Sequence, residues 1–398
     1  MKLKSKKSPS VEERASLLIA RRNLKMARSA HAYVRGSTVQ FYRWLETDSG
    51  RAIPSGPAIW ICGDCHIGNL GPLANNDGQI DVQIRDFDQS VIGNPAHDLI
   101  RLSLSLASAA RGSDLPGVIT ARMLERVIEG YERAFVSGGA KAAEPPIIQK
   151  VLRRSTKRTW KHLAKERIEN TAPFIPFGKR FWHLSKEEMQ AVRQLFEKDH
   201  VRRLVTALRQ RNSDASITVV DAAYWVKGCS SLGNLRIAVL VQVEDEKDGL
   251  CLIDIKEAVK PAAPQGEKSS MPKDQGERVV QAARHLSPYL GDRMLAEHLL
   301  DRSVVLRELM PQDLQLNLDQ LSSDEATDTA GYLAFVVGKA HAGQMNAATK
   351  KKWLETLRQH RSKTLDAPSW LWSSIVDLIT SHEAAYLEHC RKYALQGA

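Results

Sequence analysis

Two short apolar runs, each followed at once by a cluster of acidic and amide side chains, constrain this chain more than any other feature. The first run, 58–62, leads into 63–69 (GDCHIGN), and the second, 80–84, leads into 86–88 (DFD). Short apolar runs bounded by turn residues are typical of buried strands. We therefore expect two strands whose ends present these polar groups.

Three of the polar residues have the chemistry of phosphoryl transfer. Asp64 and Asn69 are separated by four residues, and Asp86 begins the second cluster. In kinases one Asp positions the attacking hydroxyl, while an Asn at this spacing and an Asp on the following loop hold the magnesium ions that bridge the phosphates. Asp, Gly and Asn are also frequent in ordinary turns, but here they follow one buried-type strand and precede another. We therefore predict Asp64 as the catalytic residue and Asn69 and Asp86 as metal ligands.

The same stretch holds Cys62 and Cys65 followed by His66, a spacing shared with covalent haem attachment and with redox pairs. Haem attachment requires export, and the basic residues 1–10 are not followed by the apolar segment of a secretory signal. A zinc finger would need a second cysteine pair at finger spacing. We therefore expect two small, half-buried thiols.

The composition indicates a cytoplasmic protein with affinity for anions. There are 57 Lys and Arg residues against 46 Asp and Glu, a net charge of +11 that favours nucleotides, nucleic acid or acidic partners. The 5 scattered cysteines are typical of a reducing compartment. No apolar run reaches the roughly 18 residues of a membrane-spanning helix, so we expect no membrane contact.

The chain changes to β-type sequence at about residue 216. Apolar runs broken by turn residues follow one another from 217 to 255, which predicts a hairpin-rich sheet. Between two of these runs, small residues would let backbone N–H groups approach a phosphate. These residues are Gly228, Ser230, Ser231 and Gly233. A plain hairpin has a similar composition, so this Gly-rich loop needs a second signal.

Lys256 supplies that second signal. It lies on the third strand of this region, where a kinase places the lysine that pairs with nucleotide phosphates and with a Glu of the next helix. A helix is expected over 277–289, so we predict Glu277 as the partner of Lys256, with Glu257 as the alternative. ATP and Mg²⁺ are the predicted cofactors.

Two further helices bear on the site. Apolar residues at helical spacing predict a helix over 97–110 with Asp98 in its first turn, where a carboxylate suits the helix dipole. We expect Asp98 to brace the catalytic loop through backbone N–H groups. A helix over 325–345 places His341 near its end, and we interpret this histidine as packed rather than catalytic.

The segment 149–168 carries eight Lys and Arg residues and is expected to form one helix. Such a helix could follow a phosphate backbone. A run of charges is more often a solvated helix face. Nucleic acid is therefore a disfavoured alternative partner.

The order of these segments differs from that of a protein kinase, in which the Gly-rich loop and the strand lysine come first. Placing 216–398 before 1–215 restores the kinase order, and such permutation is tolerated when chain ends lie at the surface. We therefore predict an α+β, protein-kinase-like, two-lobed fold that is circularly permuted. Its parts are a helical catalytic lobe at 1–215, a β-rich nucleotide-binding lobe at 216–312, and helices at 313–398 that complete the catalytic lobe.

Several segments together resemble the bacterial family catalogued as domain of unknown function 2252, and the resemblance covers nearly the whole chain. They are 32–42 (AYVRGSTVQFY), 62–71 (CGDCHIGNLG), 85–106 (RDFDQSVIGNPAHDLIRLSLSL), 226–241 (VKGCSSLGNLRIAVLV), 255–259 (IKEAV), 277–284 (ERVVQAAR) and 306–314 (LRELMPQDL). This family is grouped with the protein-kinase-like superfamily. The catalytic segment is also similar to that of aminoglycoside phosphotransferases.

The resemblance implies roles residue by residue: catalytic Asp64, metal ligands Asn69 and Asp86, and nucleotide-binding Lys256. It also implies that Asp88 is a second carboxylate near the metal and that Asp98 braces the loop, and we assign His66 to the same structural support. The chain departs from related phosphotransferases at Cys62, where they have His, and at 68–71 (GNLG), where an aromatic residue would follow the Asn. Neither departure removes a catalytic group.

The leading expectation is an ATP- and magnesium-dependent phosphotransferase that acts on a hydroxyl of a small molecule or a protein. One alternative shares the site: an AMP transferase that binds the nucleotide in reverse. The other is a catalytically silent regulator that binds nucleotide or nucleic acid, which the positive charge would suit. The motifs specify neither the acceptor nor the oligomeric state.

Overall fold

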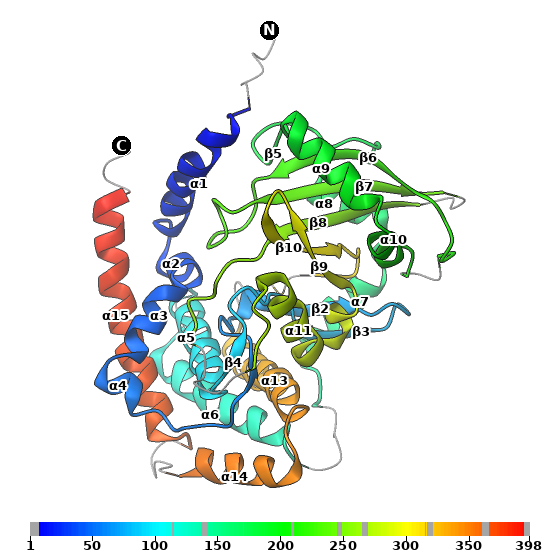
Figure 1. The fold of residues 1–398 in the computed structure, drawn as a ribbon. Helices are drawn as coiled ribbons and strands as arrows, with labels where there is room; N and C mark the ends of the chain where they lie inside the picture. The colour runs from blue at the N-terminus through cyan, green and yellow to red at the C-terminus, as the bar shows by residue number, and fades with distance from the viewer. Residues whose placement is uncertain are drawn as a thin grey trace.

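The computed structural model shows an α+β protein, as predicted, in which an antiparallel sheet is stacked against a larger group of helices (Figure 1). The structure describes residues 8–113, 115–136, 142–169, 171–207, 211–244, 249–264, 270–314, 316, 321–359 and 366–393. Residues 245–248, within the region 217–255 predicted to form a hairpin-rich sheet, lie outside this part of the chain. Helices from opposite ends of the sequence, α1 (Val11–Met26) and α15 (Ser369–Tyr393), contact each other along one side of the molecule (Figure 1).

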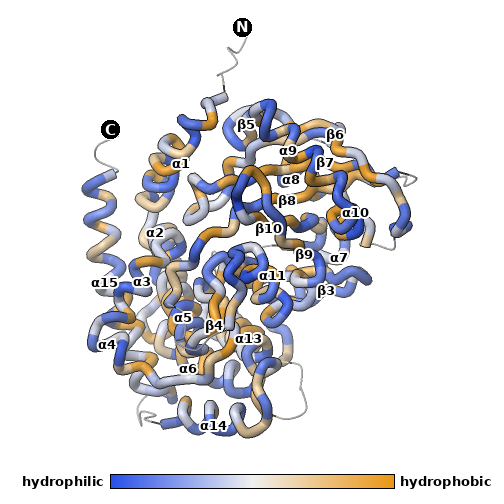
Figure 2. Tube along the Cα trace, viewed as in Figure 1, coloured by the Kyte–Doolittle hydropathy of each residue, from blue (hydrophilic) through white to orange (hydrophobic). Residues whose placement is uncertain are grey.

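The sheet has six strands in the order β5-β6-β7-β8-β10-β9. They are β5 (Phe181–Trp182), β6 (Ile217–Trp225), β7 (Arg236–Val243), β8 (Leu250–Glu257), β9 (Met294–Leu299) and β10 (Arg302–Glu308). Successive residues of β7 enter different hydrophobic clusters, Val239 with the helices α9 (Lys186–Phe196) and α10 (Asp199–Thr206), and Leu240 with α8 (Trp160–Arg167). The central strands are therefore covered on both faces, which explains their nearly continuous apolar sequence (Figure 2).

The boundary predicted at residue 216 is wrong, because the sheet begins earlier in the chain. β5 pairs with β6, and its rings stack on the rings of that strand, Phe181 on Trp225 at 5.7 Å and Trp182 on Tyr224 at 5.9 Å between centroids. Helix α9 also packs on β6. A two-residue strand is too short to show an alternating pattern, so the sequence gives no periodic signal for it.

The helical part is centred on α5 (Ala96–Gly112), α6 (Gly117–Arg133) and α13 (Ser323–Ala342). Although α13 lies about two hundred residues after α6, the two pack closely, and a Cβ at Gly130 would lie only 2.0 Å from the carbonyl oxygen of Gly331. The remaining helices here are α2 (Ala30–Gly36), α3 (Thr38–Leu45), α4 (Asp48–Arg51) and α14 (Ala347–Arg358). On the part of the chain that the structure describes, no helix is long and apolar enough to cross a membrane.

The single basic helix predicted over 149–168 is in fact two helices, α7 (Pro146–Thr156) and α8. The chain turns between them because Arg158 is buried there and its Nε donates to the carbonyl of Pro311 at 2.6 Å. Thr159 then caps the start of α8. The basic residues consequently do not form one continuous face.

Residues 59–93, which overlap with both predicted strands, form two small antiparallel strand pairs. β1 (Ile59–Ile61) pairs with β4 (Val91–Gly93), and β2 (Leu70–Ala74) pairs with β3 (Ile80–Ile84), with the short 3₁₀ helix η1 (Ile67–Asn69) between β1 and β2. The predicted strands correspond to β1 and β3. After β8, the helices α11 (Gln275–Leu286) and α12 (Pro288–Gly291) lead to β9.

Candidate active site

A buried carboxylate holds the loop after β1 from beneath. Asp98 accepts hydrogen bonds from the backbone N–H groups of Cys62 at 2.7 Å and Gly63 at 2.9 Å, which is the bracing contact predicted for it. Gly63 has φ +73°, and a Cβ there would lie 2.1 Å from the carbonyl oxygen of Gln89. Only glycine fits this turn, which places Asp64 at the tip of a rigid loop.

The brace continues through a chain of buried side chains. A carboxylate can only accept, so His341 Nε2 is the donor to Asp98 Oδ2 at 3.1 Å. His341 Nδ1 then accepts from the hydroxyl of Tyr131 at 2.9 Å, and Trp353 Nε1 donates to that hydroxyl at 3.2 Å. His341 is thus packed, as expected, and it also ties α13 to the loop.

Asp64 is nearly buried and forms an ion pair with Arg101 of α5. The arginine side chain is fully buried, and its guanidinium also lies over the ring of Phe41 at 5.2 Å. Asn69 Nδ2 donates to the backbone carbonyl of Asp64 at 3.0 Å, which fixes the two ends of the loop together. No role was predicted for Arg101, although a single arginine among the apolar residues of a core helix is a signal for a buried ion pair.

The side chains next to this loop are also buried. Cys62 and Cys65 are fully buried rather than half-buried as expected. Burial lowers the pKa of His66 to about 4, so this histidine is neutral near pH 7. Cys62 and Cys65 belong to the hydrophobic core beside the loop, whereas His66 lines the cavity described below.

Asp86 and Lys256 are 170 positions apart in the sequence, and the fold joins them directly. Lys256 Nζ lies 3.1 Å from Asp86 Oδ1 and 3.2 Å from Oδ2, and it also forms an ion pair with Asp88. Burial opposes ionisation of Asp86, but the charges of Lys256 and Arg307 outweigh it and hold the pKa of Asp86 well below its usual range. Burial and the charge of Asp86 raise the pKa of Asp88 to about 6.

Glu277 does not form the ion pair predicted with Lys256 in the described part of the chain. It is exposed on α11, which packs on β9 and β10, whereas Lys256 lies on β8 with β10 between. Glu257, the alternative, pairs with Arg302 at 2.8 Å. Neighbouring residues on a helix point about 100° apart, so it is Arg278 that faces inward.

Arg278 links α11 to the DFD segment. Its guanidinium donates to the backbone carbonyls of Ser90 at 2.5 Å, Asp88 at 2.9 Å and Val259 at 3.0 Å. The side chain is buried, so these bonds replace its hydration. No role was predicted for Arg278, because hydrogen bonds to backbone carbonyls of three separate segments leave no pattern in the residues around it.

The Gly-rich loop between β6 and β7 is sharply bent at two of its glycines. Gly228 has φ +103° and Gly233 has φ +110°, conformations that favour glycine. Lys25 Nζ, at the end of α1, donates to the carbonyl of Gly228 at 2.7 Å and holds the loop over the site. A Cβ at Gly233 would lie 3.6 Å from the side chain of Ile19 in α1, and Gly233 is not among the residues that line the cavity described next.

A cavity of about 350 Å³ brings most of the predicted site residues together. Its lining includes Asp64, His66, Asn69, Asp86, Gly228, Ser230 and Ser231. Lys256 and Asp88 lie beside it, against Asp86. This cleft is where the helical part meets the Gly-rich loop.

Basic side chains outnumber acidic ones in the lining of the cleft. Of the described residues that line it, seven are Lys or Arg and three are Asp. The cations are Lys25, Arg35, Arg85, Arg167, Lys227, Arg236 and Arg307. Burial, reinforced by Arg236, lowers the pKa of Lys227 well below its usual range. Such an arrangement attracts polyanions, and guanidinium groups suit phosphate oxygens in particular.

The donor set fits magnesium bound together with a nucleotide. Mg²⁺ is usually held by one or two carboxylates and by substrate phosphates. Asp86 supplies a carboxylate, and Asn69 keeps its amide oxygen because its amide nitrogen is used by the loop. Within the described residues, no group of three or more His, Cys, Asp or Glu could hold a metal ion by itself.

A family model described as "Uncharacterized protein conserved in bacteria (DUF2252)" matches residues 14–392, and the chain belongs to this family. The family predicted from the sequence is therefore confirmed. No curated protein and no solved structure matches the chain.

Proposed function

We propose that the protein is an ATP- and magnesium-dependent phosphotransferase that acts on a hydroxyl group. The observation that carries this proposal is the contact of Lys256 with Asp86 at 3.1 Å beside a cleft lined by Asp64, Asn69 and the Gly-rich loop. Each of these groups has a distinct task in phosphoryl transfer. The excess of cations in the cleft suits a triphosphate.

In this mechanism Asp64 accepts a hydrogen bond from the acceptor hydroxyl and orients its oxygen toward the γ-phosphorus. The ion pair with Arg101 fixes the direction of this carboxylate. Lys256 exchanges part of its contact with Asp86 for the nucleotide phosphates. Magnesium, when bound by Asn69 and Asp86, would neutralise charge on the phosphates. Catalysis would then come mainly from positioning and preorganised charge.

We also propose that the fold is a circularly permuted, two-lobed relative of the protein kinases. Three features support this. The lysine strand β8 is followed by a helix, α11, that packs on the same sheet. The catalytic loop precedes the sheet in the chain, and α13 returns to complete the helical part.

The test is transfer from [γ-³²P]ATP with magnesium, together with calorimetric binding of a non-hydrolysable ATP analogue. We expect Asp64→Asn to bind the nucleotide but not to transfer phosphate, and Lys256→Met and Asp86→Asn to lose nucleotide affinity. The exposed substitution Asp77→Asn is the matched control. Transfer of AMP instead, read as a larger mass increase of the product, or binding of nucleotide or RNA without any turnover, would replace the proposal by one of the alternatives.

A further inference from the structure

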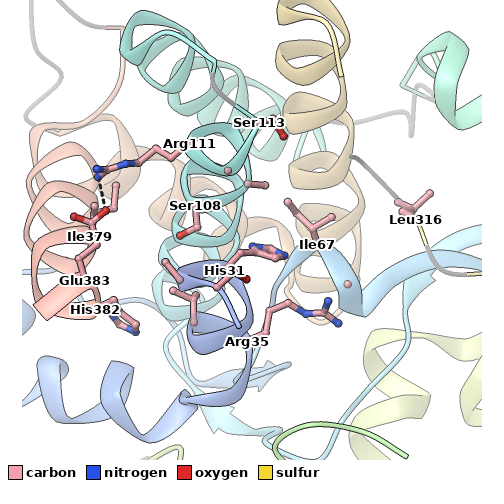
Figure 3. Close-up of a pocket in the computed structure, with 16 residues that line it drawn as sticks. His31, Arg35, Ile67, Ser108, Arg111, Ser113, Leu316, Ile379, His382 and Glu383 are labelled. Carbon is pink, nitrogen blue, oxygen red and sulfur yellow. Dashed lines mark ion pairs between the residues drawn. The ribbon is translucent and has the colours of Figure 1, made fainter. Parts of the chain in front are cut away.

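A second and larger cavity lies next to the cleft and has no part in the mechanism so far. Its volume is about 680 Å³, within the range of sites for small organic molecules. It is enclosed by α2, α5, α15 and η1, and Figure 3 shows the side chains of His31 and Ser108 near its centre. Arg35 and Gly68 line both cavities, so the two are adjacent at the catalytic loop.

Arg35 marks the junction. Its guanidinium lies against Gly68, where a Cβ would approach its Nη2 to 2.6 Å, and only glycine leaves room for it. Among the residues that the structure describes, no carboxylate forms an ion pair with Arg35. A guanidinium without a counter-charge, placed between a triphosphate cleft and a second cavity, suits the negative charge of a phosphoryl group in transfer.

The rest of the lining is close to neutral. Arg111 and Glu383 neutralise each other in an ion pair of 2.8 Å between α5 and α15 (Figure 3). His382 is buried, and its Nδ1 must donate to the carbonyl of Leu378 at 2.9 Å, because a carbonyl only accepts. Its Nε2 is therefore an acceptor, and it has no hydrogen-bond partner in the described structure.

Apart from His31, the remaining side chains of the lining are mostly hydroxyl or apolar groups. Ser108 and Ser113 offer hydroxyls, and Val34, Ile67 and Ile379 offer apolar surface. Among the described residues of this lining, the carboxylate is that of Glu383, and it is paired with Arg111. The lining therefore offers no unpaired carboxylate that could bind the ammonium group of a ligand. The positive charges of Arg35 and of the basic residues in the cleft would repel a positively charged ligand.

We propose that this cavity binds the phosphate acceptor, and that the acceptor is a neutral or anionic hydroxyl-bearing small molecule rather than a polycation or a protein side chain. The inference rests on the proposed function. The acceptor oxygen would attack the γ-phosphorus, the bond from that phosphorus to the bridging oxygen would break, and ADP would leave. The hydroxyl proton would pass to the Asp64 carboxylate, and Arg35 would bind the transferred group.

The test uses the full chain, magnesium and [γ-³²P]ATP with a defined acceptor panel. The panel contains neutral sugars and nucleosides, sugar acids, and the polycation kanamycin. We expect labelled product from neutral or acidic members. We expect Ser108→Trp, which fills the cavity, to lower transfer by about 100-fold through displacement of the acceptor. Binding of the ATP analogue should stay unchanged in this variant.

Two further variants keep the result interpretable. Ser373→Trp, at an exposed position of α15, is the control for the added ring and should transfer normally. Arg35→Met should lower kcat more than it changes the acceptor KM, and Arg35→Lys should restore part of the loss. Transfer to kanamycin alone, transfer that Ser108→Trp leaves intact, or no transfer to any member while ATP–magnesium binds would overturn this inference. Loss of ATP–magnesium binding in the unaltered protein would instead overturn the proposed function.

Discussion

Substitution of Asp98 by Asn tests how far the loop that carries Asp64 depends on the buried brace. The amide has nearly the same shape, so the change isolates charge and hydrogen bonding. Asp98 accepts from two backbone N–H groups at 2.7 and 2.9 Å and from His341 at 3.1 Å. An amide can keep one oxygen acceptor, but its NH₂ group must then face one of these donors.

The expected cost follows from the less damaging orientation, in which the NH₂ faces Gly63. One hydrogen bond to a charged group is lost, worth about 1.5–3 kcal/mol, and a buried donor is left unsatisfied at about 1–3 kcal/mol. Since the two contributions overlap, we expect Asp98→Asn to lower the free energy of unfolding by about 2–4 kcal/mol. Removing His341 as well should add less than its separate cost, because the two residues are coupled.

The measurement is urea unfolding followed by circular dichroism, with Asp77→Asn in an exposed turn as the control. If Asp98→Asn is no more destabilising than Asp77→Asn, the brace contributes nothing and the reasoning is wrong. If the proposed function is correct, Asp98→Asn should also lower phosphate transfer while the ATP analogue still binds. The substitution displaces the loop that carries Asp64 but leaves Lys256 in place.

Three other predictions follow from local geometry. Gly63→Ala should destabilise by about 1–3 kcal/mol more than Gly78→Ala in urea unfolding. Both glycines have positive φ, but an added Cβ would lie 2.1 Å from a backbone oxygen at Gly63 and would meet nothing within 4 Å at Gly78; equal losses would contradict this. Burial lowers the pKa of His382 from 6.5 to about 4, so the stability it contributes above pH 6.5 is lost as pH falls toward 4. Between pH 8 and pH 5 this lowers the free energy of unfolding by about 2 kcal/mol. In unfolding measured at both pH values, His382→Asn should lose correspondingly less stability between pH 8 and pH 5 than the unaltered protein. Magnesium binding, followed by calorimetry, should be weak alone and tighten when ATP analogue is present; tight binding without nucleotide would argue against Asn69 and Asp86 as its ligands.

Much of the candidate site could be predicted because its parts are local. The loop from Asp64 to Asn69, the Gly63 turn and the position of Asp98 in a first helical turn depend on residues close together in sequence. Spacing and steric limits act over such distances. Lys256 was recognised for the same reason, from its place on a strand after a Gly-rich loop.

The contacts between distant segments could not be predicted in the same way. The sequence indicated a lysine and an aspartate of matching roles, but only the packing of β8 against the DFD segment brought Lys256 to Asp86. The partner expected on the next helix was wrong, because the rotation of α11 turned Glu277 outward and Arg278 inward. Strand β5, which precedes the rest of the sheet in the chain, was not predicted because two residues are too few to show an alternating apolar pattern.

The sequence by itself therefore determined the α+β class, the family and the chemical groups of the site. Tertiary structure alone decided that Arg101 pairs with Asp64, that His341 reaches Asp98 from a helix more than two hundred residues away, and that a second cavity lies beside the loop. The physical reason is that turn and helix preferences act between near neighbours, whereas ion pairs and cavities arise where separate elements pack and exclude water.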